Sequence, residues 1–303
     1  MKYLIFGNNG QLGKEFTNQL KANEIEVIGY DLPYFDVSDF LTVSQIINRE
    51  KPNVVLNCAA YTNVELAESS YEDAYKINAT GVENLAICCK RDNAKLVHFS
   101  TDYVFDGKRN TPGLYNEDDA PNPINTYGTT KLRGEELGLS ANGDILILRT
   151  SWLYSEEPNN FLFKVLQWAN NSEHIKVADD EFSIPTSARL VVSIALKSIN
   201  NNLSGLYNLT CTGYCSRFDW AKEILKLAKS NTIIYPAKAK DFVQLAKRPA
   251  FSALNNAKLS AALQIDIPYW LDDLTDFWSW KEDKNRLATP TIRRIRMDTG
   301  FMD

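Results

Sequence analysis

Short apolar runs alternate with longer amphipathic stretches along the first half of the chain. The runs lie at residues 3–6, 26–30, 54–57, 95–99 and 145–148, and each has the length of a strand. Between them, apolar residues recur at helical spacing in residues 12–20, 44–50, 74–90 and 129–139. Strands that alternate with helices are typical of an α/β fold with a doubly wound parallel sheet, which we expect here.

The alternation loosens after about residue 150. Strand candidates remain at 175–177 and 206–210, and helix candidates at 161–169, 190–199 and 218–229. We therefore expect a first domain over residues 1–150 and a smaller α/β substrate-binding domain over 151–282, partly interleaved with the first. Residues 283–303 contain four arginines and show neither the helical nor the strand pattern of apolar residues, which predicts an extended or loosely docked tail. Residues 106–125 are rich in Gly, Pro, Asn and Asp, which predicts a long loop.

Composition narrows the class of protein. The chain has 303 residues, of which 44% are apolar and 23% charged, so it is long enough for a sizeable core. The net charge of -5 argues against nucleic-acid binding, which needs a basic surface. Two histidines without a Cys/His cluster predict no structural metal.

Cysteine usage and the longest apolar runs indicate the compartment. The five cysteines are odd in number, form no CxxC pair and lie mostly in apolar stretches, which predicts free buried thiols in a reducing cytosol. The opening MKYLIF run is too short for a signal peptide, and no stretch approaches the ~18 apolar residues of a membrane span. We expect a soluble, cytoplasmic protein that does not bind membranes.

A glycine pattern, GNNGQLG, follows the first predicted strand and opens the first predicted helix. In a Rossmann-type sheet, Gly7 would allow a tight turn, Gly10 would admit a pyrophosphate close to the backbone, and Gly13 would let helix and strand pack closely. The pattern predicts a dinucleotide site.

The second predicted strand ends at Asp31, about 18 residues beyond Gly13. A carboxylate there can accept hydrogen bonds from the ribose 2′-OH of the adenosine half. No arginine follows to pair with a 2′-phosphate, because Leu32 and Pro33 come next. NADH or NADPH is therefore the expected cofactor, with NADH favoured.

Tyr127 and Lys131 lie four residues apart at the start of a predicted helix, on one helical face. A neighbouring ammonium favours the phenolate, so we expect Lys131 to lower the pKa of Tyr127 toward the working range and to bind the nicotinamide ribose. Thr101 follows an apolar strand, at the sheet edge where ligands bind, and can stabilise charge on a carbonyl oxygen. Thr101, Tyr127 and Lys131 together predict carbonyl reduction.

Several blocks make the chain resemble the extended short-chain dehydrogenase/reductases, and within them the dTDP-4-dehydrorhamnose reductase family. Beside the glycine pattern these are STDYVF (100–105), YGTTK (127–131) and RTSW (149–152). Further matching blocks are NCAAYTNVELAE (57–68), INATGVENLA (77–86), EDDAPNPINTYG (117–128), NNF (159–161), IPT (184–186) and KRPAFSALNNAKL (247–259). The resemblance extends from residue 1 to about residue 270.

The resemblance implies a role for individual residues. Tyr127 would be the proton donor to the C4 carbonyl oxygen of a keto sugar, assisted by Lys131 and Thr101, while NAD(P)H delivers hydride to C4. Substrate would meet Thr101, Asp102 and Trp152. The cofactor would be lined by Gly10, Gln11, Leu12, Asp31, Asp36, Val37, Ala60, Tyr61 and Thr62.

Two arginines add to this picture. Arg248 is a candidate for the sugar-nucleotide diphosphate, because a guanidinium suits phosphate geometry. Some members of the family are described as dimers bridged by magnesium through glutamates, and Glu15 is present here. However, the position three residues after the IPT block is Arg189, a cation that would repel a metal. We expect a monomer or weak homodimer without a magnesium bridge.

Three functions stay open. The first is reduction of dTDP-4-dehydro-β-L-rhamnose to dTDP-L-rhamnose for cell-surface polysaccharide. The second is reduction of a related 4-keto-6-deoxy sugar on another nucleotide, since nothing in the sequence distinguishes thymine from uracil. The third is a non-catalytic role like that of the regulatory subunit of methionine adenosyltransferase, which the retained Thr101, Tyr127 and Lys131 disfavour.

Overall fold

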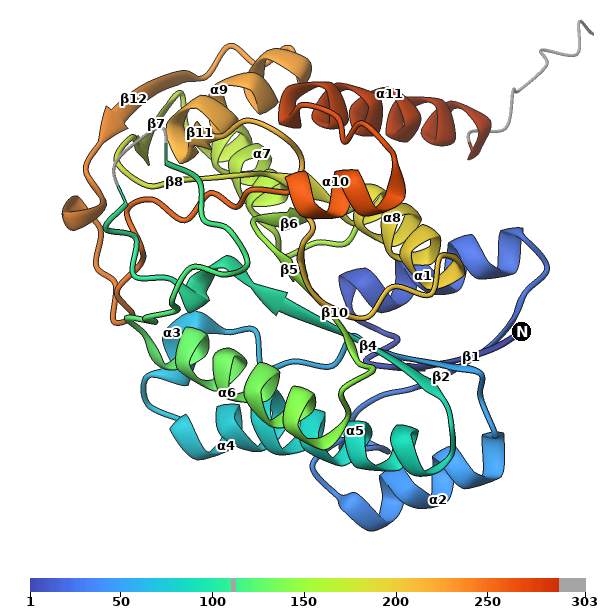
Figure 1. The fold of residues 1–303 in the computed structure, drawn as a ribbon. Coiled ribbons are helices and arrows are strands. Elements are labelled where there is room, and N and C mark those ends of the chain that lie inside the picture. Colours follow the sequence, from blue (N-terminus) through green and yellow to red (C-terminus); the bar gives the residue numbers. More distant parts are fainter. Residues whose placement is uncertain (110–112, 289–303) are drawn as a thin grey trace, which may run out of the picture.

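The computed structural model describes residues 1–109 and 113–288. Its centre is a six-stranded sheet in the order β10-β5-β4-β3-β1-β2, in which every neighbouring pair is parallel (Figure 1). The strands are β1 (Lys2–Phe6), β2 (Glu26–Tyr30), β3 (Val54–Asn57), β4 (Lys95–Thr101), β5 (Leu146–Thr150) and β10 (Gly205–Asn208). The predicted α/β class with a doubly wound parallel sheet is confirmed.

Helices cover both faces of this sheet (Figure 1). One face packs against α1 (Gln11–Ala22), α8 (Ala188–Asn200) and α10 (Ala257–Leu263). The other packs against α2 (Phe40–Glu50) and α5 (Gly81–Arg91), with α6 (Thr126–Ala141) beside α5. Two short helices, α3 (Val64–Ala67) and α4 (Tyr71–Tyr75), precede α5.

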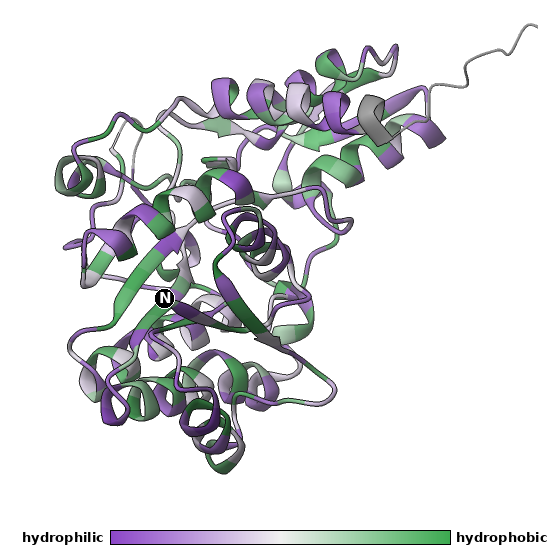
Figure 2. Cartoon of the chain, turned by 90° about the vertical axis from the view of Figure 1, so that its right-hand side faces the viewer, coloured by the Kyte–Doolittle hydropathy of each residue, from purple (hydrophilic) through white to green (hydrophobic). Residues whose placement is uncertain are grey.

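Alternation along each strand builds these two cores. In β1, Tyr3 and Ile5 enter the core under α1 and α8, whereas Leu4 and Phe6 enter the core under α2 and α5. Because successive side chains point to opposite faces, a strand buried on both sides is apolar at most of its positions. Figure 2 shows the resulting concentration of hydrophobic residues on the central strands.

The second half of the chain builds a smaller unit around its own apolar core. Its helices are α7 (Phe161–Asn171), α9 (Arg217–Leu227) and α11 (Trp270–Ala288), and it contains three two-stranded sheets. The strand pairs are β6 (Leu153–Tyr154) with β9 (Thr186–Ser187), β7 (His174–Ala178) with β12 (Ile233–Ala237), and β8 (Phe182–Ser183) with β11 (Cys215–Ser216).

The second half also returns to the central sheet, because β10 pairs with β5 and α8 packs against α1. The helix expected over 74–90 is present as three helical segments that follow one another without a gap: α4, a π-helical turn at Lys76–Thr80, and α5.

The predicted tail is partly wrong. Residues 283–288 continue α11, whose apolar side Trp270, Leu274 and Phe277 anchors in the core and whose following residues are helix formers. The rest of that predicted tail, 289–303, lies outside the described residues. Within the described part of the chain, no helix is both long and apolar enough to cross a membrane. All five cysteines are free thiols, and four of them are buried.

Candidate active site

The larger of two adjoining cavities lies at the carboxyl ends of β1 and β3, where the strand order reverses. Its volume is about 750 Å³. In an open α/β sheet this reversal leaves a crevice that binds ligands, because the loops after the two strands diverge to opposite faces.

The glycine turn forms the floor of this cavity. Gly7 has φ +81°, and a Cβ there would lie 2.5 Å from the backbone nitrogen of Ala59. A Cβ on Gly13 would lie 2.1 Å from the carbonyl oxygen of Gly7, so α1 can approach β1 only with glycine at this position. Gly10 is the N-cap of α1, and a Cβ there would meet no protein atom closer than 3.5 Å. Its missing side chain leaves open space at the helix N-terminus, which suits a pyrophosphate.

Asp31 stands at the far end of the same cavity, just after β2. Its carboxylate accepts hydrogen bonds from the backbone N–H of Asn9 at 2.7 Å and of Leu32 at 2.8 Å. These two bonds hold the carboxylate at the cavity wall. Every expected cofactor residue except Gly13 lines this cavity, namely Gly7, Gly10, Gln11, Leu12, Asp31, Asp36, Val37, Ala60, Tyr61, Thr62, Tyr127 and Lys131.

Asn78, in the π-helical turn, ties the cofactor loop to the catalytic helix. Its Oδ1 accepts from the backbone N–H of Tyr61 at 2.9 Å, and its Nδ2 donates to the Tyr61 carbonyl and to the Thr130 hydroxyl. A π-helical turn shifts the register of the helix locally, which is often a feature of functional sites. These contacts give Asn78 a structural role between the two elements.

Tyr127 lies in the first turn of α6. The helix begins at Thr126 because Asn125 caps it, accepting from the backbone N–H of Gly128 at 2.7 Å. A Cβ on Gly128 would lie 2.1 Å from the Tyr103 carbonyl oxygen, so only glycine lets α6 pack closely against the segment after β4. This contact brings Tyr127 to Thr101, and the two form a hydrogen bond.

Burial raises the pKa of Tyr127, and the hydrogen bond with Thr101 acts in the opposite direction. The expected lowering of this pKa by Lys131 is therefore not found. The phenol sits in a desolvated site, while the Lys131 ammonium is held by other partners. A raised pKa keeps the hydroxyl protonated but makes it a weaker acid, so proton transfer depends on the charge that develops on the acceptor oxygen.

Lys131 is almost fully buried, with 1% of its surface exposed. Its Nζ donates to the Phe99 carbonyl at 2.6 Å and lies 3.3 Å from His98 Nε2. Burial lowers its pKa to about 8, although Glu135 and Cys58 oppose that shift.

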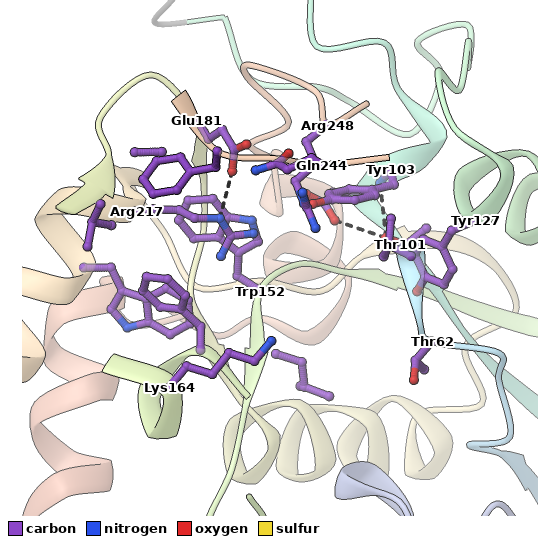
Figure 3. Close-up of a pocket in the computed structure, with 18 of the residues that line it drawn as sticks. Thr62, Thr101, Tyr103, Tyr127, Trp152, Lys164, Glu181, Arg217, Gln244 and Arg248 are labelled. Atoms are coloured by element: carbon purple, nitrogen blue, oxygen red, sulfur yellow. Dashed lines mark hydrogen bonds and ion pairs between the residues drawn. The ribbon is translucent and has the colours of Figure 1, made fainter. Parts of the chain in front are cut away.

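The second cavity, of about 460 Å³, meets the first at Thr101, Asp102, Tyr127 and Trp152. Figure 3 shows Thr101 and Tyr127 at one side of it, with Trp152 and Arg217 across the opening. All four expected substrate residues line it, namely Thr101, Asp102, Trp152 and Arg248.

Asp102 is a buried carboxylate at the junction. Its Oδ1 accepts from Thr101 at 3.1 Å, and its Oδ2 accepts from Ser183 at 2.9 Å and from Ser252 at 2.5 Å. Burial raises its pKa to about 6 against the lowering effect of these three hydroxyls. Since Ser183 and Ser252 come from the second half of the chain, Asp102 also joins the two halves.

The expected diphosphate ligand, Arg248, is ion-paired. Its NH2 lies 2.7 Å from Glu65 Oε1, while Glu65 Oε2 accepts from the backbone N–H groups of Leu245 and Ala246. Glu65 thus holds the segment that carries Arg248 against α3.

Sequence reasoning missed several residues of the smaller cavity. Arg217 stacks on Trp152, with its guanidinium carbon 4.2 Å from a ring centroid, and its Nε lies 2.9 Å from Glu181 Oε2. Lys164 and Lys176 also line this cavity. The sequence signal nearest to Lys164 was the NNF block, whose Asn160 caps α7 and donates to Gln11 in the glycine turn.

Within the described ranges, no group of three His, Cys, Asp or Glu residues could hold a metal. Glu15 accepts a hydrogen bond from Gln19 at 2.7 Å, and Arg189 lies over the Trp280 ring at 3.8 Å.

A crevice for a dinucleotide that opens onto a hydroxyl, a tyrosine and a lysine defines an NAD(P)H-dependent oxidoreductase of the short-chain dehydrogenase/reductase class. A family model described as "RmlD substrate binding domain" matches residues 1–281. The dTDP-4-dehydrorhamnose reductase of Aggregatibacter actinomycetemcomitans is 35% identical over 93% of this chain and 99% of its own length.

Solved structures agree. A dTDP-4-dehydrorhamnose reductase from Clostridium acetobutylicum superimposes with a TM-score of 0.89 at 38% identity, over 93% of this chain and 100% of that one. One from Bacillus anthracis, in complex with NADP, gives a TM-score of 0.89 at 35% identity, over 92% of this chain and 100% of that one. The chain belongs to the dTDP-4-dehydrorhamnose reductase family.

Proposed function

We propose that this enzyme reduces the C4 keto group of dTDP-4-dehydro-β-L-rhamnose to give dTDP-L-rhamnose, using NADH or NADPH. The observation that carries the proposal is the meeting of two cavities at Thr101 and Tyr127. One cavity has the glycine turn of a dinucleotide site, and the other has cationic and aromatic walls suited to a sugar nucleotide. The names of the relatives support this substrate.

The nicotinamide cofactor supplies the hydride that reaches C4 of the sugar. Tyr127 gives its phenolic proton to the C4 oxygen, and the negative charge that develops on that oxygen drives the transfer; the raised pKa of Tyr127 means only that the proton is present at neutral pH. When substrate is bound, the Thr101 hydroxyl would turn its one proton from Asp102 Oδ1 to the same oxygen as charge develops there. Lys131 would bind the nicotinamide ribose through its ammonium group.

The nucleotide end of the substrate would occupy the smaller cavity beyond Trp152. Four cations line it and would neutralise the diphosphate, namely Lys164, Lys176, Arg217 and Arg248. In Figure 3 the Lys164 side chain extends toward the centre of the cavity. Trp152, which stacks on Trp220 at 5.6 Å between centroids, offers a rigid face to the sugar.

For the cofactor, we favour NADH over NADPH. Both carboxylate oxygens of Asp31 are directed at the end of β2 by backbone N–H groups, where a 2′-phosphate would meet their charge. The B. anthracis relative in complex with NADP is the reason to measure both cofactors.

The physical state we propose is a monomer or weak homodimer in the cytoplasm. Free thiols at all five cysteines fit a reducing compartment, which also supplies nicotinamide cofactor. A second candidate is a reductase of a 4-keto-6-deoxy sugar on another nucleotide. The cations of the smaller cavity would bind the diphosphate, which all these nucleotides share, and so do not distinguish one base from another.

The test is loss of NADH or NADPH absorbance with a panel of dTDP-, UDP- and GDP-linked 4-keto-6-deoxy sugars. We expect the highest kcat/KM with dTDP-4-dehydro-β-L-rhamnose and NADH. A higher value with a UDP or GDP sugar would favour the second candidate. No turnover with any of them would overturn the enzyme proposal and leave a binding role like that of the methionine adenosyltransferase regulatory subunit.

A further inference from the structure

His98 lies in the middle of β4 with none of its surface exposed, and it faces two polar side chains. Its Nδ1 lies 3.1 Å from Asn57 Nδ2, and its Nε2 lies 3.3 Å from Lys131 Nζ. Asn57 ends β3 and is the direct partner of His98 in the strand register, so the contact is built into the sheet. A polar pair at the centre of an apolar sheet costs stability unless its polar atoms are hydrogen-bonded, so the partners of His98 determine its state.

The donors and acceptors determine how His98 must be protonated. An ammonium is a donor only, so beside a charged Lys131 the Nε2 atom must be the acceptor, and the ring proton is then on Nδ1. A charged imidazole is excluded, because burial and the Lys131 charge hold the pKa of His98 well below its usual range.

Asn57 can fix this tautomer. As placed, its Nδ2 faces the ring, and its Oδ1 is buried without a hydrogen-bond partner among the described residues. The opposite orientation of the amide brings Oδ1 to the Nδ1–H of His98 as acceptor, which is the pairing that the ring requires.

Lys131 has three N–H groups, and two of them are used by partners among the residues that the structure describes. One goes to the Phe99 carbonyl and one to His98, while the side chain lines the cofactor cavity. We propose that neutral His98, held in its Nδ1–H tautomer by Asn57, is a positioning residue that aims the third N–H of Lys131 at the nicotinamide ribose. The proposal rests on the proposed function only for the identity of that ribose.

The other charged or titratable groups around Lys131 do not take this role. Glu135 is engaged by Arg149 at 2.6 Å, and burial keeps the Cys58 thiol protonated by raising its pKa. The Asp31 charge also raises the pKa of Cys58, so it adds to the effect of burial on that thiol. His98 is therefore the side chain that sets the direction of the Lys131 ammonium.

The first experiment reads the tautomer in the wild-type protein by ¹⁵N NMR of labelled histidine. The chain has two histidines, and His174 is exposed, so His174→Gln assigns the remaining signal to His98. We expect His98 protonated on Nδ1 and unchanged from pH 6 to pH 7.5, while Lys131 is charged. A proton on Nε2, or titration of His98 in that range, would overturn the proposal.

The second experiment compares cofactor binding in variants of His98. His98→Phe keeps the ring but has no acceptor, whereas His98→Gln places an amide oxygen near the position of Nε2. We expect NADH to bind roughly 10-fold more weakly to the Phe variant, as for loss of a charge-assisted contact, with recovery in the Gln variant. ADP, which lacks the nicotinamide ribose, should bind all of them and the His174→Gln control equally.

Equal weakening of NADH and ADP, or wild-type NADH affinity in the Phe variant, would contradict a positioning role. If the Phe variant does not fold, the NADH affinity of the Gln variant and the tautomer of His98 in the wild-type protein still test the proposal. Neither measurement uses a sugar nucleotide. Both therefore remain valid tests of the role of His98 even if the protein does not reduce the proposed substrate.

Discussion

At the scale of single residues, Asp102 shows how the site balances charge against burial. The carboxylate keeps three hydroxyl donors, yet its pKa is about 6 rather than the ordinary 3.8. The desolvation of a buried charge outweighs the hydrogen bonds, so the folded protein holds this proton more tightly than the unfolded chain does.

Asp102 therefore makes stability depend on pH. Its folded pKa lies above its unfolded value, so its favourable contribution is complete below pH 3.8 and is lost as pH rises to about 6. We expect Asp102→Asn to gain roughly 1–3 kcal/mol in unfolding free energy relative to wild type between pH 4.5 and pH 7. Urea unfolding at several pH values measures this difference.

Asp118→Asn is the matched control, because it removes the same charge at an exposed position. Its difference from wild type should vary little over the same range. A constant difference for Asp102→Asn as well would mean that the Asp102 carboxylate has no raised pKa in the folded state.

The sequence could reveal Thr101, Tyr127 and Lys131 because their chemistry depends on local spacing and on the end of one strand. It could not reveal Arg217 beside Glu181, which are 36 residues apart and meet where β8 pairs with β11. It could not reveal the contact of His98 with Lys131 either, since that contact joins β4 to α6.

At the scale of elements, the strands of the central sheet were predicted well because burial on both faces makes them mostly apolar. Five strands that the structure describes in the second half were not predicted, namely β6, β8, β9, β11 and β12, and four of these have only two residues, too few to show a pattern. Several helices begin a few residues before the predicted start, because the capping residue and the first turn lie before the first residues of the apolar face. The Asp39 side chain accepts from the backbone N–H groups of Leu41 and Thr42, so α2 begins at Phe40 rather than near Ser44. Asn125 likewise starts α6 early enough to place Tyr127 in its first turn.

A buried ion pair fixes the catalytic helix to the sheet. Arg149 in β5 and Glu135 in α6 are each 3% exposed and make two hydrogen bonds, at 2.9 and 2.6 Å. Glu135→Gln would leave the Arg149 charge buried without a counter-charge, and we expect a loss of about 3–5 kcal/mol in unfolding free energy. Chemical denaturation measures this loss.

The double variant Glu135→Leu with Arg149→Met should recover most of that loss, because neither charge remains. Arg133→Ala is the control on the same helix, since its pair with Glu136 is exposed, and it should cost less than about 1 kcal/mol. A Glu135→Gln variant as stable as that control would contradict the role given to the pair.

At the scale of the whole molecule, the second half of the chain returns to the central sheet, so the two halves are interleaved more deeply than the periodicity suggests. A short strand such as β10 has the same pattern in either unit, and only its pairing with β5 assigns it to the central sheet. The active site lies where the two halves meet, so residues from both halves complete it.

The residues Glu15 and Arg189 lead to a prediction about the effect of magnesium on the oligomeric state. Arg189 is held over Trp280, and its charge opposes a cation beside Glu15. We expect the sedimentation coefficient to be the same in excess magnesium and in EDTA. A dimer that forms only with magnesium would show that the arginine does not prevent a metal bridge.

The central claim is that hydride reaches C4 of the keto sugar while Tyr127 supplies the proton. NADH carrying deuterium at the transferred position, incubated with dTDP-4-dehydro-β-L-rhamnose, tests it by NMR of the product. We predict deuterium at C4 of dTDP-L-rhamnose with wild type, and a rate at least ~100-fold lower with Tyr127→Phe while NADH binding is retained. Deuterium elsewhere in the sugar, or an unchanged rate in the variant, would contradict the account.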